Sequence, residues 1–294
     1  MKKVLNLAFA FTIATLFVAC SDDNNTVATT GDLTVDLTGL EELGSDFVYE
    51  GLLIVNGSPV STGTFTSVSF PQTYTVGISD LETATTFVLS IEPAGETGAD
   101  ALAPAATKIL AGDFSGSSAN VTSTGIVGDF SASWGKYILA TPTDADDTNE
   151  ESGVWFLDNS GDEAVAGLGL PTLTDGWVYE GWVVLDGTPV STGTFSTADL
   201  ADDNAATSPY KGTVGNGPAF PGEDYVTGSA AGVDFPTDLK GATVVISVEP
   251  SPDNSTAPFT LKPLIHVVPA DAMNHTVISM VAGPLATLSG SVSR

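Results

Sequence analysis

The chain is poor in the side chains that carry most enzyme chemistry, because its 294 residues include one cysteine and two histidines. A lone thiol cannot form an internal disulfide, and zinc sites normally need several clustered cysteine and histidine ligands. A serine or cysteine nucleophile needs an adjacent base, usually histidine. His266 lies in an apolar run that we interpret as a strand, and His275 follows nine residues later. We therefore predict no zinc site and no catalytic residues.

Positive charge is also scarce, with 8 Lys and Arg against 36 Asp and Glu and a formal net charge of −28. Nucleic-acid binding depends on lysine and arginine side chains that neutralise phosphates, so we expect no nucleic-acid partner. The chain is nevertheless 42% hydrophobic and only 15% charged. This composition indicates a folded protein with a substantial core rather than a disordered acidic segment.

The N-terminus has the layout of an export signal. Met1-Lys2-Lys3 is positively charged, residues 4–19 are almost wholly apolar, and the small residue Ala19 precedes Cys20. The apolar run is shorter than the ~20 residues that a membrane-spanning helix needs. The site resembles the lipobox of bacterial lipoproteins, which implies a signal peptide over residues 1–19 and a lipidated (palmitate-bearing) Cys20. The alternative is an ordinary cleaved signal with an incidental cysteine.

The residues after the cysteine are polar and acidic, and we predict a flexible tether over residues 20–30. Ser21, Asp22 and Asp23 resemble the acidic surface-export signals of Bacteroidota lipoproteins, which implies an outer-membrane lipoprotein facing the cell exterior. The alternative is a solvated spacer that faces the periplasm. Removal of residues 1–19, which include two lysines, lowers the net charge to about −30. We therefore expect the protein to attach to the membrane through the acyl anchor on Cys20 and not through its acidic surface.

The mature sequence predicts an all-β fold. Its apolar runs are short, rich in Val, Ile, Thr and aromatic residues, and separated by turns that use many of the 31 glycines and 17 prolines. Asn56-Gly57 and Asp186-Gly187 each follow such a run and predict β-hairpins, because these residues tolerate positive φ. Short strands at this spacing are typical of antiparallel β-sandwiches.

An internal repeat indicates two domains. Residues 47–65 and 177–195 are identical at 12 of 19 positions, and residues 87–93 match residues 244–250 after a further shift of 27 residues. We predict two tandem, duplicated antiparallel β-sandwich domains, residues 31–150 and 151–294. The additional residues should form an acidic, mobile excursion near 196–241, outside the second sheet.

The repeated pattern resembles the extracytoplasmic domain of anti-sigma-K factors. The matching residues are Tyr49, Gly57–Ser61, Phe65 and Glu92-Pro93 in the first copy, and Tyr179, Trp182, Gly187–Ser191, Phe195 and Glu249-Pro250 in the second. In that family a cytoplasmic segment holds the sigma factor and a membrane-spanning helix follows it. We expect neither part in the mature chain, and therefore no direct sigma-factor contact.

Two sets of repeat residues are candidate site residues. The carboxylates Glu50, Glu180, Glu92 and Glu249 could act as a glycosidase pair if two of them faced each other across a cleft. Their positions inside or at the end of predicted strands favour a structural role, because buried polar groups must find partners. Trp177 and Tyr179 should share one strand face and Trp182 the other. Exposed, they could contact a ligand by stacking on sugars, although core packing is the commoner use.

Two acidic runs, residues 144–151 and 199–204, supply oxygen ligands that could hold Ca²⁺. The first lacks the glycine and the spaced glutamate of an EF-hand loop, so solvated turns are the commoner reading. We predict no cofactor and leave Ca²⁺ open.

The predicted function is that of a non-catalytic, lipid-anchored extracytoplasmic binding or interaction protein, whose ligand is an unknown protein or polysaccharide. One alternative is an accessory sensor in envelope-stress signalling, which only the family resemblance suggests. Another is a glycan-active hydrolase that uses the repeated glutamates.

Overall fold

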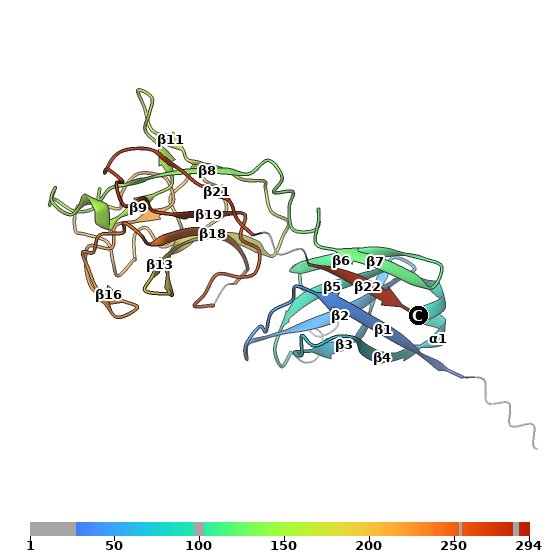
Figure 1. The fold of residues 1–294 in the computed structure, drawn as a ribbon. Helices are drawn as coiled ribbons and strands as arrows, with labels where there is room; N and C mark the ends of the chain where they lie inside the picture. Colours follow the sequence, from blue (N-terminus) through green and yellow to red (C-terminus); the bar gives the residue numbers. More distant parts are fainter. Residues whose placement is uncertain (1–27, 97–102, 253–254, 285–287) are drawn as a thin grey trace, which may run out of the picture.

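A computed structural model describes residues 28–96, 103–252, 255–284 and 288–294. The predicted signal peptide, Cys20, Ser21, Asp22 and Asp23 lie outside the described residues. The described chain is almost entirely antiparallel β-structure, with one six-residue α-helix (Figure 1). The predicted all-β fold is therefore confirmed. No helix in the described ranges is long and apolar enough to cross a membrane.

Eight strands form one nearly closed sheet in the order β3-β2-β5-β6-β7-β22-β1-β4. The strands are β1 (Thr30–Thr38), β2 (Phe47–Val55), β3 (Ser58–Phe65), β4 (Gln72–Gly77), β5 (Ala84–Pro93), β6 (Lys108–Ser115), β7 (Ser118–Thr122) and β22 (Ser289–Ser293), and helix α1 (Ile78–Thr83) joins β4 to β5. Several side chains of these strands are fully buried, among them Leu33, Tyr49, Leu53, Phe87 and Leu110. The first unit is thus one strongly curved sheet around its core.

The last strand completes this first sheet. β22 pairs on one side with β7 and on the other with β1, so Val292 lies between Ala119 and Val35. Arg294 then donates to the carbonyl oxygens of Ala84 (2.8 Å) and Gly116 (3.2 Å). The segments that precede and follow the second unit in the sequence therefore form neighbouring strands, as Figure 1 shows for β7 and β22.

The strand pairing differs from the predicted division at residue 150. β8 (Trp134–Leu139) pairs only with strands of the second unit, whereas β22 belongs to the first sheet. The second unit is inserted between β7 and β22 rather than following the first unit in tandem. A five-residue strand of Ser and Gly with one apolar side chain, Val292, gives no sequence signal of which sheet it joins.

The second unit contains two five-stranded sheets, one in the order β14-β13-β18-β19-β21 and one in the order β12-β8-β9-β15, to which β20 adds by pairing with β8. Its remaining elements are β9 (Val154–Trp155), β10 (Leu157–Asp158), β11 (Val165–Ala166), β12 (Leu168–Gly169), β13 (Trp177–Leu185), β14 (Thr188–Phe195), β15 (Gly222–Glu223), β16 (Ser229–Ala230), β17 (Val233–Asp234), β18 (Thr243–Pro250), β19 (Leu264–Val267), β20 (Ile278–Ser279), β21 (Val281–Ala282) and the 3-10 turn η2 (Glu150–Ser152).

The two sheets of the second unit face each other, as in a sandwich. Glycines allow the close approach: a Cβ on Gly181 in β13 would lie 2.8 Å from the ring of Phe156. A Cβ on Gly135 in β8 would lie 2.8 Å from Leu264 of the opposite sheet. Phe156 and Leu264 are buried in the same core.

The repeated sequence forms matching hairpins. Asn56-Gly57 and Asp186-Gly187 have positive φ at all four residues, and each dipeptide joins two antiparallel strands. Both hairpins contain a register shift, after Gly51 in β2 and after Gly181 in β13. The predicted hairpins are therefore confirmed.

The tyrosines of the repeat also take matching places. Tyr49 stacks on Phe65 and Tyr179 on Phe195, with ring centroids 5.5 Å apart in both pairs. The Tyr49 hydroxyl donates to the Glu41 carbonyl (2.9 Å), and the Tyr179 hydroxyl donates to the Pro171 carbonyl (2.6 Å). Each acceptor precedes its tyrosine by eight residues. The local structures match, while gene duplication as their origin stays a prediction.

Part of the insertion near residues 196–241 is packed into the core, chiefly residues 221–226. It lies outside the β13 sheet, but its strand β15 pairs with β9, and its residues Tyr225 and Leu239 are fully buried. Tyr225 packs against Tyr210 and Phe235 with centroids 5.7 and 5.2 Å apart. The insertion is acidic and lies outside the β13 sheet, as predicted, but the prediction of a mobile excursion was wrong for this part, because these scattered aromatic residues pack together although glycines and turns separate them in the sequence.

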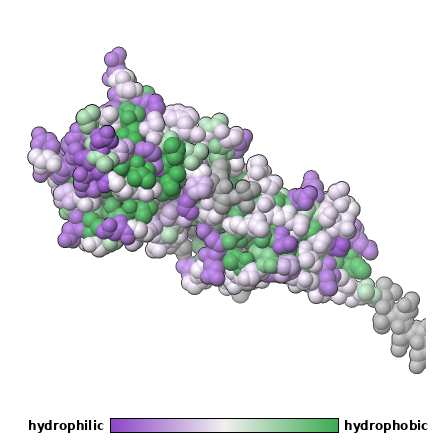
Figure 2. Space-filling view, in the orientation of Figure 1, coloured by the Kyte–Doolittle hydropathy of each residue, from purple (hydrophilic) through white to green (hydrophobic). Residues whose placement is uncertain are grey.

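The surface mixes polar and apolar residues. Figure 2 shows several separate apolar groups over both units, each bordered by hydrophilic residues. The exposed large apolar side chains of the described chain include Trp134, Val267 and Val281, all from the second unit.

Candidate functional site

The glutamates Glu50 and Glu180 hold the bulged hairpins together. Their side chains are 8% and 5% exposed. Glu50 accepts a hydrogen bond from the Ser61 hydroxyl, and Glu180 accepts one from the Ser191 hydroxyl. These serines lie beside the register shift in each hairpin. The two carboxylates therefore make the same hydrogen bond at the same place in each hairpin.

Glu92 and Glu249 fasten loops to the ends of their strands. Glu92, 4% exposed, accepts from the Ala105 amide at 3.0 and 2.9 Å and from the Ser90 hydroxyl. Glu249 is fully buried and accepts from the Phe259 amide (2.9 Å). Burial raises the pKa of Glu92, and its hydrogen bonds partly oppose the shift. None of the four repeated glutamates offers an open carboxylate to a sugar, so they lack the placement that a glycosidase pair requires.

The aromatic residues of β13 are core residues. Trp177, Tyr179 and Trp182 are 5%, 2% and 2% exposed. The Trp182 indole donates to the Ser247 hydroxyl (2.8 Å), and Trp177 packs against Phe259 with centroids 5.9 Å apart. Stacking of these three rings on a ligand, as considered from the sequence, does not fit their burial.

Trp134 is the exposed tryptophan that sequence reasoning missed. Its side chain is 48% exposed and lies against the backbone of Gly169, where an added Cβ would be 2.1 Å from the indole nitrogen. Lys136 Nζ lies 5.9 Å from the ring centroid and forms an ion pair with Asp158 (2.6 Å). Trp134 lies outside the repeated segments, so the repeat gave no reason to single it out.

Both histidines have partners. His266 lies in β19, and its Nδ1 atom is 3.0 Å from the Tyr137 hydroxyl oxygen. This is the arrangement expected for a strand histidine with a hydrogen-bond partner. His275 Nε2 lies 3.2 Å from Glu150.

The acidic run at residues 144–151 forms turns. Asp146 accepts from the Thr148 amide (2.9 Å), and Asp144 accepts from the Asn149 side chain (2.7 Å). No group of three or more Asp, Glu, His or Cys side chains arranged to hold a metal occurs among the described residues.

Three carboxylates of the insertion are buried, namely Asp202, Glu223 and Asp224. Asp202 accepts from the Gly222 amide (2.9 Å), Glu223 from the Ser208 hydroxyl, and Asp224 from the Trp155 indole (2.8 Å). Burial raises the pKa of all three and brings that of Asp202 to about 7, with repulsion from Glu223 adding to the shift. Glu223 and Asp224 were not predicted, because an acidic pair in a glycine-rich segment resembles a solvated turn.

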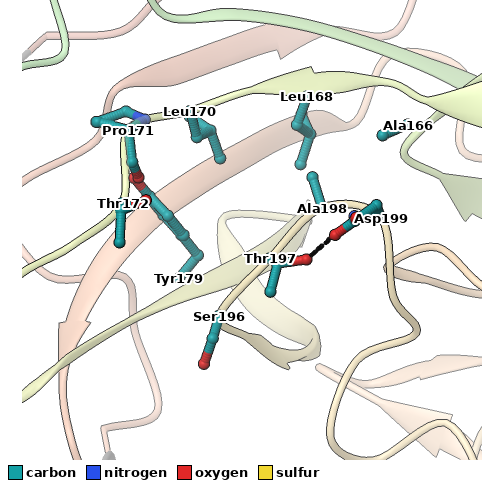
Figure 3. Close-up of a pocket in the computed structure, with 10 residues that line it drawn as sticks. All are labelled: Ala166, Leu168, Leu170, Pro171, Thr172, Tyr179, Ser196, Thr197, Ala198 and Asp199. Carbon is teal, nitrogen blue, oxygen red and sulfur yellow. Dashed lines mark hydrogen bonds between the residues drawn. The ribbon is translucent and has the colours of Figure 1, made fainter.

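A hollow of about 250 Å³ lies where the insertion begins (Figure 3). Leu168 and Leu170 form one wall, and Thr197, Ala198 and Asp199 form the opposite one. Pro171, Thr172 and Tyr179 close one end. The hollow thus combines an apolar wall with hydroxyl groups and one carboxylate.

Comparisons of the chain with protein-family models, with curated proteins and with solved structures give no match. The resemblances to bacterial lipoproteins and to anti-sigma-K factors therefore stay predictions from sequence.

Proposed function

We propose that the chain is a lipid-anchored extracytoplasmic binding protein, without catalytic activity, that holds a hydroxyl-rich ligand such as a saccharide unit in the hollow of Figure 3. The observation that carries this proposal is that the hollow has an apolar wall on one side and a polar wall on the other. Leu168 and Leu170 offer an apolar surface to the C–H face of a sugar ring. Opposite them, Thr197 and Asp199 offer a hydroxyl and a carboxylate that can bond sugar hydroxyls.

The size of the hollow limits the ligand. At about 250 Å³ it is smaller than the roughly 300–1,000 Å³ pockets that enclose drug-sized ligands. One sugar unit, or the end of a longer chain, matches this volume. Thr197 already donates to Asp199 within the same wall, which orients the carboxylate before a ligand arrives (Figure 3).

The proposed location follows from the N-terminal sequence. An acyl chain on Cys20 and a tether over residues 20–30 would hold the two β-units beside the outer membrane, facing the cell exterior. Stable anchoring needs more than one acyl chain, or an acyl chain with a basic patch. With a net charge of −28 the protein surface does not supply the basic patch, so the proposed anchor on Cys20 needs more than one acyl chain.

Saccharide binding can be tested with two changes in the hollow. Ala198→Leu should weaken binding at least tenfold by filling the space, and Asp199→Asn should weaken it less because the shape is kept. Binding of the mature chain to a panel of mono- and oligosaccharides, followed by ligand-observed NMR, measures both effects. Asp234→Asn, which removes an exposed carboxylate elsewhere in the insertion, is the matched control. Binding that survives Ala198→Leu unchanged, or a wild-type protein that binds no saccharide, would contradict the proposal.

The anchor is tested separately. Cys20→Ser should abolish acyl labelling in cells and move the protein from the detergent phase to the aqueous phase, because hydroxyl cannot replace thiol in this modification. Phase partition and labelling with a palmitate analogue measure the change, and Ser21→Ala is the control that keeps the thiol. Unchanged membrane association of the Cys20→Ser protein would exclude the anchor but would leave the saccharide site untouched.

A further inference from the structure

The insertion begins with a loop that closes on the hairpin it leaves. The Asp203 amide donates to the Thr194 carbonyl of β14 (2.8 Å), and the Thr194 hydroxyl donates to the Asp203 carboxylate (2.9 Å). Asp202 fastens the same loop to β15, because it accepts from the Gly222 amide (2.9 Å). Residues 196–199 of this loop form one wall of the hollow in Figure 3. The position of that wall therefore depends on the bonds of Asp202 and Asp203.

Asp202 is buried with only one of its two oxygens bonded. The side chain is 5% exposed, and Oδ1 has no hydrogen-bond partner within the described part of the chain. A buried carboxylate is stable as an ion only when it is paired or coordinates a metal. Among the described residues no ion pair includes Asp202, and no cluster of side chains is arranged to hold a metal. The surroundings of Asp202 therefore favour the neutral acid.

The charged groups that face Asp202 are all acidic. Glu223 on β15 and Asp203 on the loop itself both repel its negative charge. Glu180 of β13 places another carboxylate beside β14, where it accepts from a serine hydroxyl of that strand. Burial raises the pKa of the Tyr225 hydroxyl well above its ordinary value, and this neutral group donates to two carbonyls of β14 (3.1 and 3.0 Å). None of these groups offsets a charge on Asp202.

Of the two buried acids that face each other, Asp202 is the one that takes the proton. Glu223 accepts from the Ser208 hydroxyl through one oxygen and from the Asp224 amide (2.9 Å) through the other. Asp202 has a single donor, the Gly222 amide. Hydrogen bonds to the charged form favour ionisation, so Glu223 is the better carboxylate. Burial raises the pKa of Asp202 to about 7, repulsion from its acidic neighbours adds to the shift, and the Gly222 amide opposes it.

We propose that the loop of residues 196–204 closes on β14 and β15 only while Asp202 is protonated, and that loss of this proton loosens the wall of the hollow. The neutral acid can stay buried beside Glu223, whereas the ion adds a second charge to a site without a cation. Water stabilises the ion, so Asp202 should move outward when it ionises. The effect on ligand binding rests on the function proposed above, and the proton on Asp202 does not.

The direction of the pH dependence follows from burial. Folded, Asp202 keeps its proton up to about pH 7, whereas in the unfolded chain it ionises near its ordinary pKa of about 4. The contribution of Asp202 to the stability of the second unit should therefore fall as pH rises from about 4 through 7. The first hairpin has no such loop, because a Cβ on Gly63, which takes the place of Gly193, would meet nothing within 4 Å.

Carboxyl ¹³C NMR of the mature chain between about pH 4 and pH 9 tests the proton directly. The Asp202 signal, identified by its absence from Asp202→Asn, should titrate with a midpoint within about one unit of pH 7. A midpoint below about pH 5 would overturn the proposal. Over the same range the Asp203 amide should lose protection from hydrogen exchange, because its bond to the Thr194 carbonyl closes the loop. Constant protection of that amide would show that ionisation does not open the loop and would overturn the loosening.

Thermal unfolding separates Asp202 from the other acids of the chain. Asp202→Asn imitates the neutral acid, so its advantage in Tm over the wild type should grow by about 5–10 °C between about pH 5 and pH 8. Asp234→Asn, which removes an exposed carboxylate of the same insertion, should differ from the wild type by the same amount at both pH values. A difference between Asp202→Asn and the wild type that does not change with pH would contradict the proposal.

Saccharide binding tests the link to the hollow. The protonated fraction of Asp202 falls about tenfold between about pH 6 and pH 8, so the affinity of the wild type should fall by about the same factor. Asp202→Asn should bind equally well at both pH values. Equal pH dependence of the two proteins would overturn the link. A chain that binds no saccharide at either pH would overturn the proposed function and this link together, while the NMR titration and Tm values still decide the proton on Asp202.

Discussion

Removal of residues 288–294 should unfold the N-terminal sheet while leaving most of the second unit folded. The deletion removes β22, an interior strand of the eight-stranded sheet that pairs with both β7 and β1. Leu288 and Val292 are fully buried, and burial of two such side chains contributes about 3–6 kcal/mol. This loss is comparable to the whole stability of a typical domain, about 5–15 kcal/mol, before the lost strand pairing is counted.

Tryptophan emission reports mainly on the second unit, although the Trp177 indole also donates to the Lys108 carbonyl of β6 (3.3 Å). Trp134, Trp155, Trp177 and Trp182 all lie in the second unit, and the first sheet contains none. The truncated chain should keep a folded-type tryptophan emission, whereas hydrogen exchange of the β1 and β7 amides should become fast. If the units were arranged in tandem, with a boundary at residue 150, the same deletion would disturb the second unit instead. Protected β1 and β7 amides in the truncated chain would contradict the observed topology.

A matched pair of point changes gives the same test without shortening the chain. Val292→Asp places a carboxylate at a fully buried position and should cost several kcal/mol, because an unpaired buried charge has no compensating partner. Ser293→Asp introduces the same charge one residue later, on the exposed side of β22, opposite the uncharged residues Thr34 and Ser118. It should change the free energy of unfolding by no more than about 0.5 kcal/mol.

Local patterns in the sequence predicted local structure. Asn56-Gly57 and Asp186-Gly187 determine the hairpins because positive φ at both residues suits the twist of the flanking strands. The repeated hairpins put Tyr49 opposite Phe65 and Tyr179 opposite Phe195 at the same register. These features depend on residues close in the chain, so the sequence carries them directly.

Long-range pairing was not visible in the sequence. β22 pairs with strands that lie more than 160 residues away in the sequence. Its sequence, Ser-Gly-Ser-Val-Ser, contains nothing that specifies which strand it pairs with. The buried role of the insertion was hidden for a related reason. Asp202 and Asp224 belong to acidic turn-like segments, and only the packed structure shows that the Gly222 amide bonds Asp202 and that the Thr143 amide and the Trp155 indole bond Asp224. The candidate hollow combines residues 166–172 with 196–199, which become neighbours only through the fold.

Asp224→Ala should destabilise the second unit by about 3–5 kcal/mol. Asp224 is fully buried and accepts from the Thr143 amide (2.6 Å), the Thr143 hydroxyl and the Trp155 indole (2.8 Å). Alanine would leave these donors buried without a partner, at about 1–3 kcal/mol for each group. Part of this loss is offset, because burial raises the pKa of Asp224 and removal of the carboxylate relieves its cost of desolvation. The lost hydrogen bonds should dominate, since three donors lose their acceptor at once.

The measurement is thermal unfolding followed by tryptophan fluorescence. A loss of this size corresponds to a fall in Tm of about 10 °C. Asp234→Ala, an exposed carboxylate of the same insertion, should leave Tm within about 2 °C of the wild type. The insertion is bound to the core through Asp224, which joins it to Thr143 after β8 and to Trp155 in β9. A loosely attached acidic excursion would tolerate both changes equally. Equal Tm values for the two variants would therefore contradict the attachment through Asp224 and favour the mobile excursion that the sequence alone predicts.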